Sequence, residues 1–543
     1  MGKEALVIGV DFGTDSCRAI IVDTENGKEL AVSTSVYKRW EKGLYSVPAK
    51  NQYRHHPLDY IESLKEVLSD VVNKIPKHSV QRIRAVGIDT TASTVCFTDK
   101  NGIPLALQPH YAENPDAMFL IWKDHTAIEE AEEINQLAHD WSIDYTSLSG
   151  GNYSLEWYWA KALHILRKDH LIKDDAYAMI ELCDWLPALL TGSQKPEKVK
   201  RSRCAAGHKC LWSNQWGGYP SYDFLQTLDP HLAEMRDHLS SETYTNDKIA
   251  GRMISEWSAP LGLPDGVIVS IGLVDAHSAA IGAGIKPRTM VKIMGTSTCD
   301  IVVVPVDVMK DNLIPGISGQ VHGSVLPDMI GVEAGQAAFG DVYAWYKKLL
   351  GWVLDEYVTD AEQKQKYLDK IIISLSEHAA HIPYDQSTLV SLDWFNGRRN
   401  PNPAPDKTGM IAGLTLATTA PEIFKSLVEA TVFGSKVIFE HFQRYGMEIE
   451  EIVSVGGIAQ KSSYVMQILA DVLGVPVKVA QTEQAGALGA AMCAATAANI
   501  FPTLEVAQEK MKCGISKSYI PCEKRSRYYN QQYQEYLRLG AFR

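Results

Sequence analysis

Two stretches of the chain, far apart in the sequence, share one local pattern: an apolar strand, a Gly-Thr bend and a second apolar strand. The first copy is Leu6 to Val22, with Gly13-Thr14 at its bend, and the second is Met290 to Val304, with Gly295-Thr296 at its bend. A hairpin with these residues at its bend turns backbone N–H groups and a hydroxyl toward one point. Two such bends can hold one polyphosphate from opposite sides. The repeat therefore predicts a two-lobed nucleotide enzyme.

Length and composition support that organisation. A chain of 543 residues is too long for one ordinary hydrophobic core, so we expect two large lobes, residues 1–284 and 285–543. The net charge of −12 argues against a general nucleic-acid binder, and no apolar run approaches the ~18 residues of a membrane span. The nine cysteines are scattered and the first residues show no leader pattern. We therefore expect a cytoplasmic enzyme with no nucleic-acid and no membrane partner.

Strands alternate with helices in both halves, which is the pattern of α/β lobes. In the first half we expect strands over residues 83–89 and 267–275, and helices over residues 58–74, 127–138 and 154–168. In the second half we expect strands over residues 451–455 and 476–479, and helices over residues 462–473 and 485–498.

Asp11 stands directly before the first bend, where a carboxylate can hold Mg²⁺ through water. An ordinary buried strand and hairpin turn is the alternative interpretation of Asp11, Gly13 and Thr14. The second copy, at Gly295, Thr296 and Ser297, favours phosphate binding over that alternative. The two copies are unequal, because the second follows Met294 and can supply only donors.

Two further positions lie at the ends of expected strands. Gly456-Gly457 precedes a helix, where backbone without side chains can lie against a nucleobase or ribose, although a purely structural turn is the alternative. Asp275 ends an apolar strand, and that end of an open α/β sheet faces the ligand crevice. A carboxylate there can accept a proton from an attacking hydroxyl. It can also cap the following helix, and the two roles are compatible.

Three segments have the polar and aromatic side chains that a sugar site needs, although each also fits a structural or solvated role. They contain Trp122, Lys209 and Glu333. Cys204 and Cys210 flank His208, but the second half of a zinc ligand set is missing from that segment. The sequence has no G-x-x-x-x-G-K-[ST] loop, no G-x-G-x-x-G after a strand and no H-E-x-x-H pair.

The order of these motifs resembles the ATPase superfamily of actin, Hsp70 and sugar kinases. Within that superfamily the chain is similar to the FGGY carbohydrate kinases, in the ribulokinase branch. The likeness covers nearly the whole chain, and His125 and His277 stand at positions that separate this branch from many other sugar kinases of the family. The segments that carry it are residues 11–16, 52–57, 87–91, 113–118, 122–126, 206–209, 295–300, 333–336 and 393–399.

The resemblance implies two ribonuclease H-like (actin-like ATPase) lobes with a cleft between them. It implies ATP and Mg²⁺ as cofactors and phosphorylation of the ketopentose L-ribulose to L-ribulose 5-phosphate in L-arabinose catabolism. Asp275 is then the catalytic base and Asp11 the metal ligand. The implied substrate-binding residues are Cys96, Trp122, Lys209, Asp275 and Glu333, and the implied nucleotide-binding residues are Gly13, Thr14, Asp15, Gly295, Thr296, Ser297, Gly456, Gly457 and Gln460.

Two other functions stay open at this point. One is a sister sugar kinase for D-ribulose, ribitol or xylulose. The other is an actin- or Hsp70-like ATPase without sugar kinase activity. A chaperone of that kind needs a separate peptide-binding segment after its ATPase, whereas the nucleotide motifs here continue to about Ala490. The oligomeric state is also left open, with a homodimer as one option.

Overall fold

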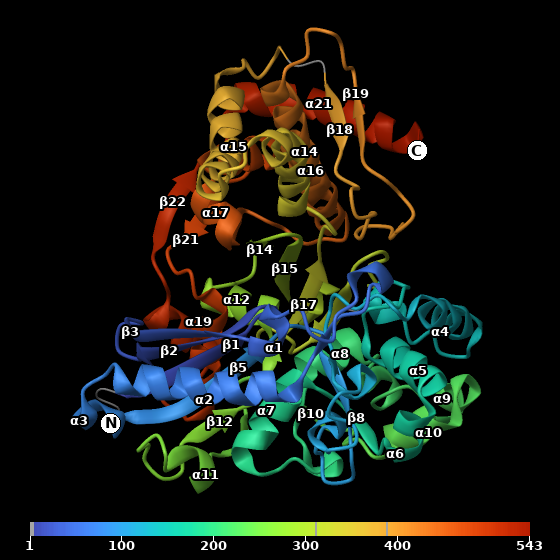
Figure 1. The fold of residues 1–543 in the computed structure, drawn as a ribbon, viewed down its shortest axis with the longest axis vertical. Coiled ribbons are helices and arrows are strands. Elements are labelled where there is room, and N and C mark those ends of the chain that lie inside the picture. Colours follow the sequence, from blue (N-terminus) through green and yellow to red (C-terminus); the bar gives the residue numbers. More distant parts are fainter. Residues whose placement is uncertain (1–4, 310–311, 387–388, 543) are drawn as a thin grey trace.

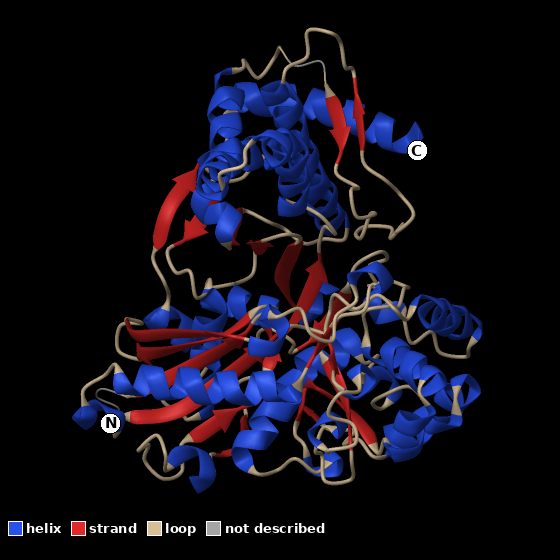
Figure 2. Ribbon diagram, in the orientation of Figure 1, coloured by secondary structure: helices blue, strands red, loops and turns tan. Residues whose placement is uncertain are grey.

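The computed structural model describes residues 5–309, 312–386 and 389–542. Figure 1 shows two sheet-containing lobes stacked along the longest axis, with the N-terminal half of the chain in the lower lobe. Figure 2 shows helices flanking the strands of both lobes. The expected α/β class with two lobes is confirmed. The outer ends of the expected lobes, residues 1–4 and 543, lie outside the described residues.

The lower lobe is built on a seven-stranded mixed sheet. Its strands are β1 (Leu6–Phe12), β2 (Ser16–Asp23), β3 (Glu29–Val36), β5 (Ile83–Thr90), β11 (Ile249–Arg252), β12 (Ile268–Ser270) and β13 (Leu273–Val274). Their order is β11-β12-β5-β1-β2-β3, and β13 also pairs with β5. β1 pairs antiparallel with β2 and parallel with β5. The parallel pairing brings the carboxyl ends of β1, β5 and β13 to one edge.

The upper lobe repeats this arrangement. Its strands are β14 (Thr289–Met294), β15 (Thr298–Pro305), β16 (Gly319–His322), β17 (Met329–Ala334), β20 (Glu451–Val455), β21 (Val477–Ala480) and β22 (Ile515–Tyr519). Their order is β16-β17-β15-β14-β20-β21-β22. β14 pairs antiparallel with β15 and parallel with β20, as β1 does with β2 and β5. The sequence repeat is therefore a repeat of sheet topology as well.

A late segment of the chain returns to the lower lobe. The helix α19 (Ala485–Ala497) packs against β1, β5 and the helix α12 (Asp275–Gly282), and Figure 1 shows it in red beside the blue strands. Glycines allow this close approach: a Cβ at Gly9 would lie 1.7 Å from the carbonyl oxygen of Ala487. A Cβ at Gly87 would lie 1.9 Å from that of Ala490. The packing places Gly486 beside the carboxyl ends of β1 and β5.

Further helices cover the lower sheet and enlarge the lobe. The helices α2 (Pro57–Asn73) and α7 (Leu182–Thr191) pack on the sheet, and α20 (Leu504–Met511) packs on α19. A four-stranded sheet with the order β4-β7-β6-β8 lies beside a group of helices that includes α8 (Arg203–Lys209). This part of the lobe consists of β4 (Arg54–His55), β6 (Val95–Thr98), β7 (Phe119–Leu120), β8 (Ala178–Glu181), α4 (Ile128–Asp140), α5 (Tyr158–Lys168), α6 (His170–Asp175), α9 (Tyr222–Leu228) and α10 (Pro230–Asp237).

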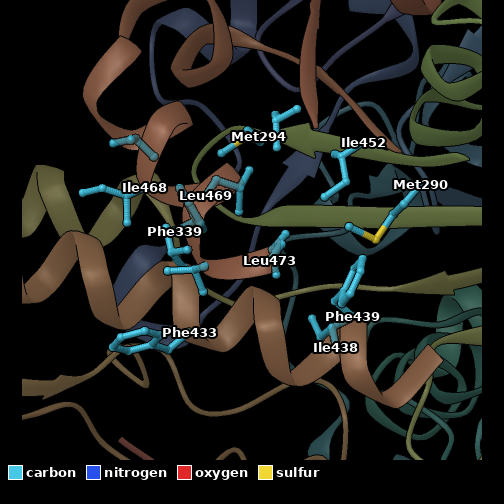
Figure 3. Packing of buried hydrophobic residues seen from close by; sticks show 14 of the residues in the cluster. Met290, Met294, Phe339, Phe433, Ile438, Phe439, Ile452, Ile468, Leu469 and Leu473 are labelled. Atoms are coloured by element: carbon cyan, nitrogen blue, oxygen red, sulfur yellow. The ribbon is translucent and has the colours of Figure 1, made fainter. Parts of the chain in front are cut away.

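The upper lobe buries its own hydrophobic core between sheet and helices. Figure 3 shows Met290 of β14 facing Phe439 of α16 (Ala420–Arg444), and Met294 of β14 near Leu469 of α18 (Ser463–Leu473). The other helices of this lobe are α14 (Gly340–Tyr357), α15 (Ala361–His381), α17 (Gly457–Lys461) and α21 (Glu523–Phe542). Shorter elements join these layers: α1 (Lys38–Glu41), α3 (Lys77–Val80), α11 (Ser255–Ser258), α13 (Val306–Met309), β9 (Arg201–Ser202), β10 (Thr243–Tyr244), β18 (Val390–Leu392) and β19 (Met410–Ala412).

Most expected elements are present within a few residues of their expected bounds, and two differ. The strand expected over residues 267–275 is divided into β12 and β13, and Asp275 is the first residue of α12. The division falls at Gly272, where a Cβ would lie 2.0 Å from the carbonyl oxygen of Cys183. The helix expected over residues 154–168 begins only at Tyr158, because a turn occupies the residues before it.

Candidate active site

The first bend connects β1 to β2 and is held by aromatic side chains. The Gly13 N–H donates to the Ser16 carbonyl at 3.0 Å, which closes the turn. The Trp122 indole N–H donates to the Thr14 hydroxyl at 2.9 Å, and the Trp40 indole N–H donates to the Asp15 carboxylate at 2.7 Å. The structure thereby places Trp122, expected at the sugar, directly beside the first bend.

Three carboxylates gather below this bend. Asp11 of β1 lies opposite Asp89 of β5 in the parallel register, and Asp275 follows β13 on the other side of β5. A Cβ at Gly486 would lie 3.2 Å from the Asp11 carboxylate and 3.4 Å from that of Asp89. Burial raises the pKa of Asp11 and of Asp89, and the charge of Asp11 raises that of Asp89 further. This concentration of negative charge is costly without a cation.

Asp275 stands at the start of α12, with the residue before it in extended conformation. Its carboxylate accepts the Ala276 N–H at 2.7 Å, so it bonds to its own helix terminus while facing the site. Burial, and then the nearby charge of Asp11, raise the pKa of Asp275 to about 7. A carboxyl group with that pKa can take up and release a proton near neutral pH. The expected catalytic base therefore has suitable electrostatics.

A cross-lobe ion pair lies on the far side of Asp275. Lys209, the last residue of α8, donates to both carboxylate oxygens of Glu333 in β17, at 3.0 and 3.3 Å. The Lys209 ammonium also lies 5.1 Å from the centre of the Trp157 ring. Burial alone would raise the pKa of Glu333, but Lys209 together with His208 and His277 outweighs it, and the pKa falls to about 2. The structure therefore joins two expected sugar ligands, one from each lobe.

A second cross-lobe contact was not expected. The Arg399 guanidinium donates to the Glu156 carboxylate at 3.1 Å, and the same carboxylate oxygen lies 3.0 Å from the His125 ring. The charge of Glu156 raises the pKa of Arg399, and Glu333 raises it further, so Arg399 faces the same site. Arg399 lies in residues 393–399, one of the segments that carry the family resemblance, but its partner Glu156 is 243 residues away in the sequence. Asp89 was missed too, although a strand ending in Asp beside β1 was a usable signal.

The second bend connects β14 to β15 and is braced by the start of α14. The Gly295 N–H donates to the Ser297 carbonyl at 3.0 Å, two residues on, whereas the acceptor in the first bend lies three residues on. The Phe339 N–H donates to the Thr296 carbonyl at 2.8 Å, and the Gly340 N–H to the Gly295 carbonyl at 3.2 Å. Gly295 and Thr296 are themselves exposed, so the bend presents its groups outward.

Gly456 and Gly457 lie next to the second bend. Gly456 has a φ of +101°, and a Cβ there would lie 2.5 Å from the Met294 carbonyl oxygen, so only glycine fits. Gly457 starts α17 and faces open space, where a side chain would meet no atom within 4 Å. Gln460 of α17 donates to the Ala480 carbonyl. The structure therefore brings the expected adenosine residues and the second bend to one surface.

Cys96 lies apart from these polar groups. It belongs to β6, is fully buried, and packs in the hydrophobic cluster that includes Phe119 and Ile180. Its expected place in the sugar pocket rested on the resemblance alone, and hydrophobic packing of its side chain explains its burial.

A divalent cation fits the carboxylate group of the lower lobe. Both carboxylate oxygens of Asp89 are buried and hold no hydrogen bond of normal geometry among the described residues. Asp11, next to it, is also an oxygen donor of the kind that Mg²⁺ prefers. A cation at this place would neutralise charge that burial otherwise makes unfavourable.

Comparison with known protein families identifies the class of protein to which the chain belongs. Residues 6–282 match the N-terminal domain of the FGGY family of carbohydrate kinases, and residues 290–498 match its C-terminal domain. The chain belongs to the FGGY family of carbohydrate kinases and is an ATP-dependent sugar kinase. This membership excludes the alternative of an ATPase without sugar kinase activity.

Relatives with assigned names are similar over nearly their whole length. The ribulokinase of Vibrio parahaemolyticus is 43% identical, with 98% of this chain and 95% of the relative covered. The ribulokinase of Shouchella clausii is 36% identical, with 98% and 94% covered. Among solved structures, a xylulose kinase from Rhodospirillum rubrum has a TM-score of 0.78 at 20% identity, over 99% of this chain and 98% of its own. A Plasmodium falciparum glycerol kinase with ADP has a TM-score of 0.76 at 16% identity, over 98% of both chains.

Within the described part of the chain, the helices are all too short or too polar to cross a membrane.

Proposed function

We propose that this kinase transfers the γ-phosphoryl group of ATP to the terminal hydroxyl of L-ribulose, forming L-ribulose 5-phosphate for L-arabinose catabolism in the cytoplasm. The ribulokinase names of relatives at 43% and 36% identity support the choice of sugar. The observation that carries the chemistry is the position of Asp275, with a pKa of about 7, among the first bend's carboxylates and the Lys209–Glu333 pair.

Asp275 acts as the general base of the reaction. Its carboxylate takes the proton from the sugar hydroxyl, the hydroxyl oxygen bonds to the γ-phosphorus, and the bond from that phosphorus to the ADP oxygen breaks. A base with a pKa near 7 is largely deprotonated at slightly alkaline pH yet basic enough to accept the proton. Its place at the carboxyl edge of the sheet fits the general position of ligands in α/β folds.

Lys209 and Glu333 hold the ketopentose from opposite lobes. An ammonium donates to sugar oxygens and a carboxylate accepts from sugar hydroxyls, so the pair can reorient from each other to a bound sugar. Because Lys209 belongs to the lower lobe and Glu333 to the upper lobe, sugar binding favours the closed arrangement. Closure excludes water, which would otherwise compete as phosphoryl acceptor. Trp122 then connects the sugar side to the phosphate side through Thr14.

The nucleotide lies mainly against residues 285–543 and the sugar mainly against residues 1–284. Thr14, Thr296 and the N–H groups of both bends surround the phosphates, while Gly456 and Gly457 leave room for adenosine. Asp11, with Asp89 beside it, would hold Mg²⁺ through water, and the ion supplies neutralisation of the phosphate charge when bound. Asp275 and the bends perform the proton transfer and the orientation.

A panel of sugars tests the proposal. ADP release is measured with L-ribulose, D-ribulose, ribitol and xylulose at matched concentrations, with Glu333→Gln as a sugar-site variant. We expect the highest kcat/KM with L-ribulose and a raised sugar KM in the variant, because Glu333 is removed as an acceptor. A strong preference for one of the other three sugars would replace the proposed substrate with that of a sister kinase.

A further inference from the structure

Two histidines and a glutamate from three separate elements meet beside the expected sugar position. They are His208 of α8, His277 of α12 and Glu333 of β17. One ligand atom from each lies within 4.8 Å of those of the other two. His208 Nδ1 and His277 Nε2 each lie 3.7 Å from Glu333 Oε2. In the sequence His208 lies between Cys204 and Cys210, where a zinc ligand set was incomplete, and the fold adds His277 and Glu333 as its neighbours.

The polar atoms of this cluster are buried and largely unused. Both histidines are only 1% exposed. Among the described residues, neither ring nitrogen of His277 and not Nδ1 of His208 has a hydrogen-bond partner. Burial lowers the pKa of His277 to about 4 and that of His208 well below its usual value, so both rings are neutral at pH 7. Neutral imidazoles have the lone pairs that a metal ligand needs.

We propose that His208, His277 and Glu333 form a binding site for a transition-metal dication such as Zn²⁺, and that the bound ion blocks the sugar position. Two imidazoles and one carboxylate form a known three-ligand set for Zn²⁺, with a fourth position left open. Bonds of about 2.0–2.1 Å place tetrahedral ligand atoms roughly 3.3–3.4 Å apart. The two 3.7 Å separations to Glu333 therefore need to shorten by only a few tenths of an ångström, and the separation between the two histidine nitrogens, which lies within 4.8 Å, must reach the same value.

The ligand chemistry separates this site from the carboxylates below the first bend. Mg²⁺ prefers oxygen ligands in octahedral geometry, and two of three ligands here are nitrogens. Glu333 can serve the ion through Oε2, which replaces the longer contact of that oxygen with Lys209 at 3.3 Å, and still accept from Lys209 through Oε1 at 3.0 Å. An ion held there binds the Glu333 carboxylate, which the proposed sugar site uses as an acceptor. It should compete with the sugar, and this second half of the inference rests on the proposed function.

Metal binding is tested without any substrate. Zn²⁺ alone is titrated into the full chain by calorimetry, and Co²⁺ into a second sample for its visible absorption. We expect one Zn²⁺ per chain, a four-coordinate Co²⁺ spectrum, and an affinity reduced more than about 10-fold in His277→Gln. His208→Asn is the second ligand variant. His378→Gln, an exposed histidine of α15, is the matched control and should bind as the wild type does.

The kinetic test is separate from the binding test. With free Zn²⁺ held by a metal buffer, inhibition should be competitive with the sugar and not with ATP, and His277→Gln should require more Zn²⁺ for the same inhibition. Equal Zn²⁺ affinity in the wild type and both ligand variants would overturn the site. Zn²⁺ binding with inhibition that the sugar does not relieve would overturn the blocking role. If L-ribulose is not phosphorylated at all, the proposed function fails while the calorimetry still decides the metal site.

Discussion

The two Gly-Thr bends have the same strand topology, but the buried charged side chains below them differ. Below the first bend, Asp11 and Asp89 face each other in neighbouring strands, and their pKa values are raised. Below the second, Lys292 of β14 donates to Asp300 of β15 at 2.9 Å, and both side chains are fully buried. Asp11 and Asp89 have no ion pair among the described residues, and burial favours their protonated forms, whereas Asp300 is paired with the Lys292 ammonium within the protein.

The two groups of buried side chains therefore suit different roles, one in binding protons or cations and the other in stabilising the fold. Unbalanced carboxylates can accept a proton or hold a cation, but they make the folded state less stable. A buried ion pair with further polar partners holds its strands in place and offers nothing to a ligand. Gln336 connects the Lys292–Asp300 pair to Asp393. Its side-chain N–H donates to the Asp393 carboxylate at 2.8 Å, and its side-chain oxygen lies 3.5 Å from the Lys292 ammonium. We infer that the lower lobe performs the proton transfer while the second bend is a stable donor platform.

The largest expected effect is on turnover, at Asp275 beside the carboxylates of the first bend. Asp275→Asn keeps the shape of the side chain but removes the base, so kcat should fall by about 10²–10⁴-fold. For the wild type, kcat/KM should rise with pH through about 7, because Asp275 must lose its proton before it can accept one. Sugar-dependent ADP release across pH 5.5–9 measures both. A folded variant with near-normal turnover would remove Asp275 from the role of base.

Breaking the Lys292–Asp300 pair below the second bend should lower the free energy of unfolding. Lys292→Met leaves Asp300 buried without its cation, which costs about 3–5 kcal/mol of the free energy of unfolding. Denaturant unfolding of the upper lobe measures this loss. The matched control is Lys478→Met, which breaks a partly exposed pair with Glu451 and should cost only about 0–1 kcal/mol. Equal losses in the two variants would show that the buried pair does not support the bend.

The Mg²⁺ concentration needed for half-maximal activity should also differ between variants of the two bends. Asp11→Asn should raise the Mg²⁺ concentration for half-maximal activity by about 10–100-fold, because it removes a carboxylate near the ion. Thr296→Ala removes one hydroxyl donor and should change it about fivefold or less. Titration of Mg²⁺ at saturating ATP compares them. The reverse ranking would mean that the second bend, not the first, brings the metal.

The sequence predicted local features of the site well and long-range pairings poorly. The Gly-Thr bends and the Gly456 turn depend on neighbouring residues, so local patterns were sufficient for them, whereas the strand expected to end at Asp275 is divided and ends at Val274. The opposition of Asp11 to Asp89 depends on which strand pairs with β1 and in which register. The Arg399–Glu156 contact depends on how the lobes meet. Hydrophobic periodicity reports which face of an element is buried, not which distant side chain lies against it.

The smallest expected effect is on melting temperature, and it tests whether the ionised Asp89 carboxylate lowers the stability of the fold. Burial raises the pKa of Asp89 above its unfolded value, so the wild type loses stability as pH rises from about 4 through the folded-state pKa. Asp89→Asn cannot ionise, so its melting temperature should exceed that of the wild type at pH 8. The gap should narrow at pH 5, where Asp89 is more protonated in the folded wild type.

Thermal unfolding without nucleotide or metal measures this gap. Asp99→Asn serves as the control, because Asp99 is partly exposed in a turn and accepts two backbone N–H groups. That variant should gain no stability as pH rises. Saturating Mg²⁺ and ATP should reduce the advantage of Asp89→Asn, because a bound cation stabilises the carboxylates of the wild type. A gap that is independent of pH would mean that Asp89 is destabilising through its packing, and that the contrast with the Lys292–Asp300 pair is not one of charge.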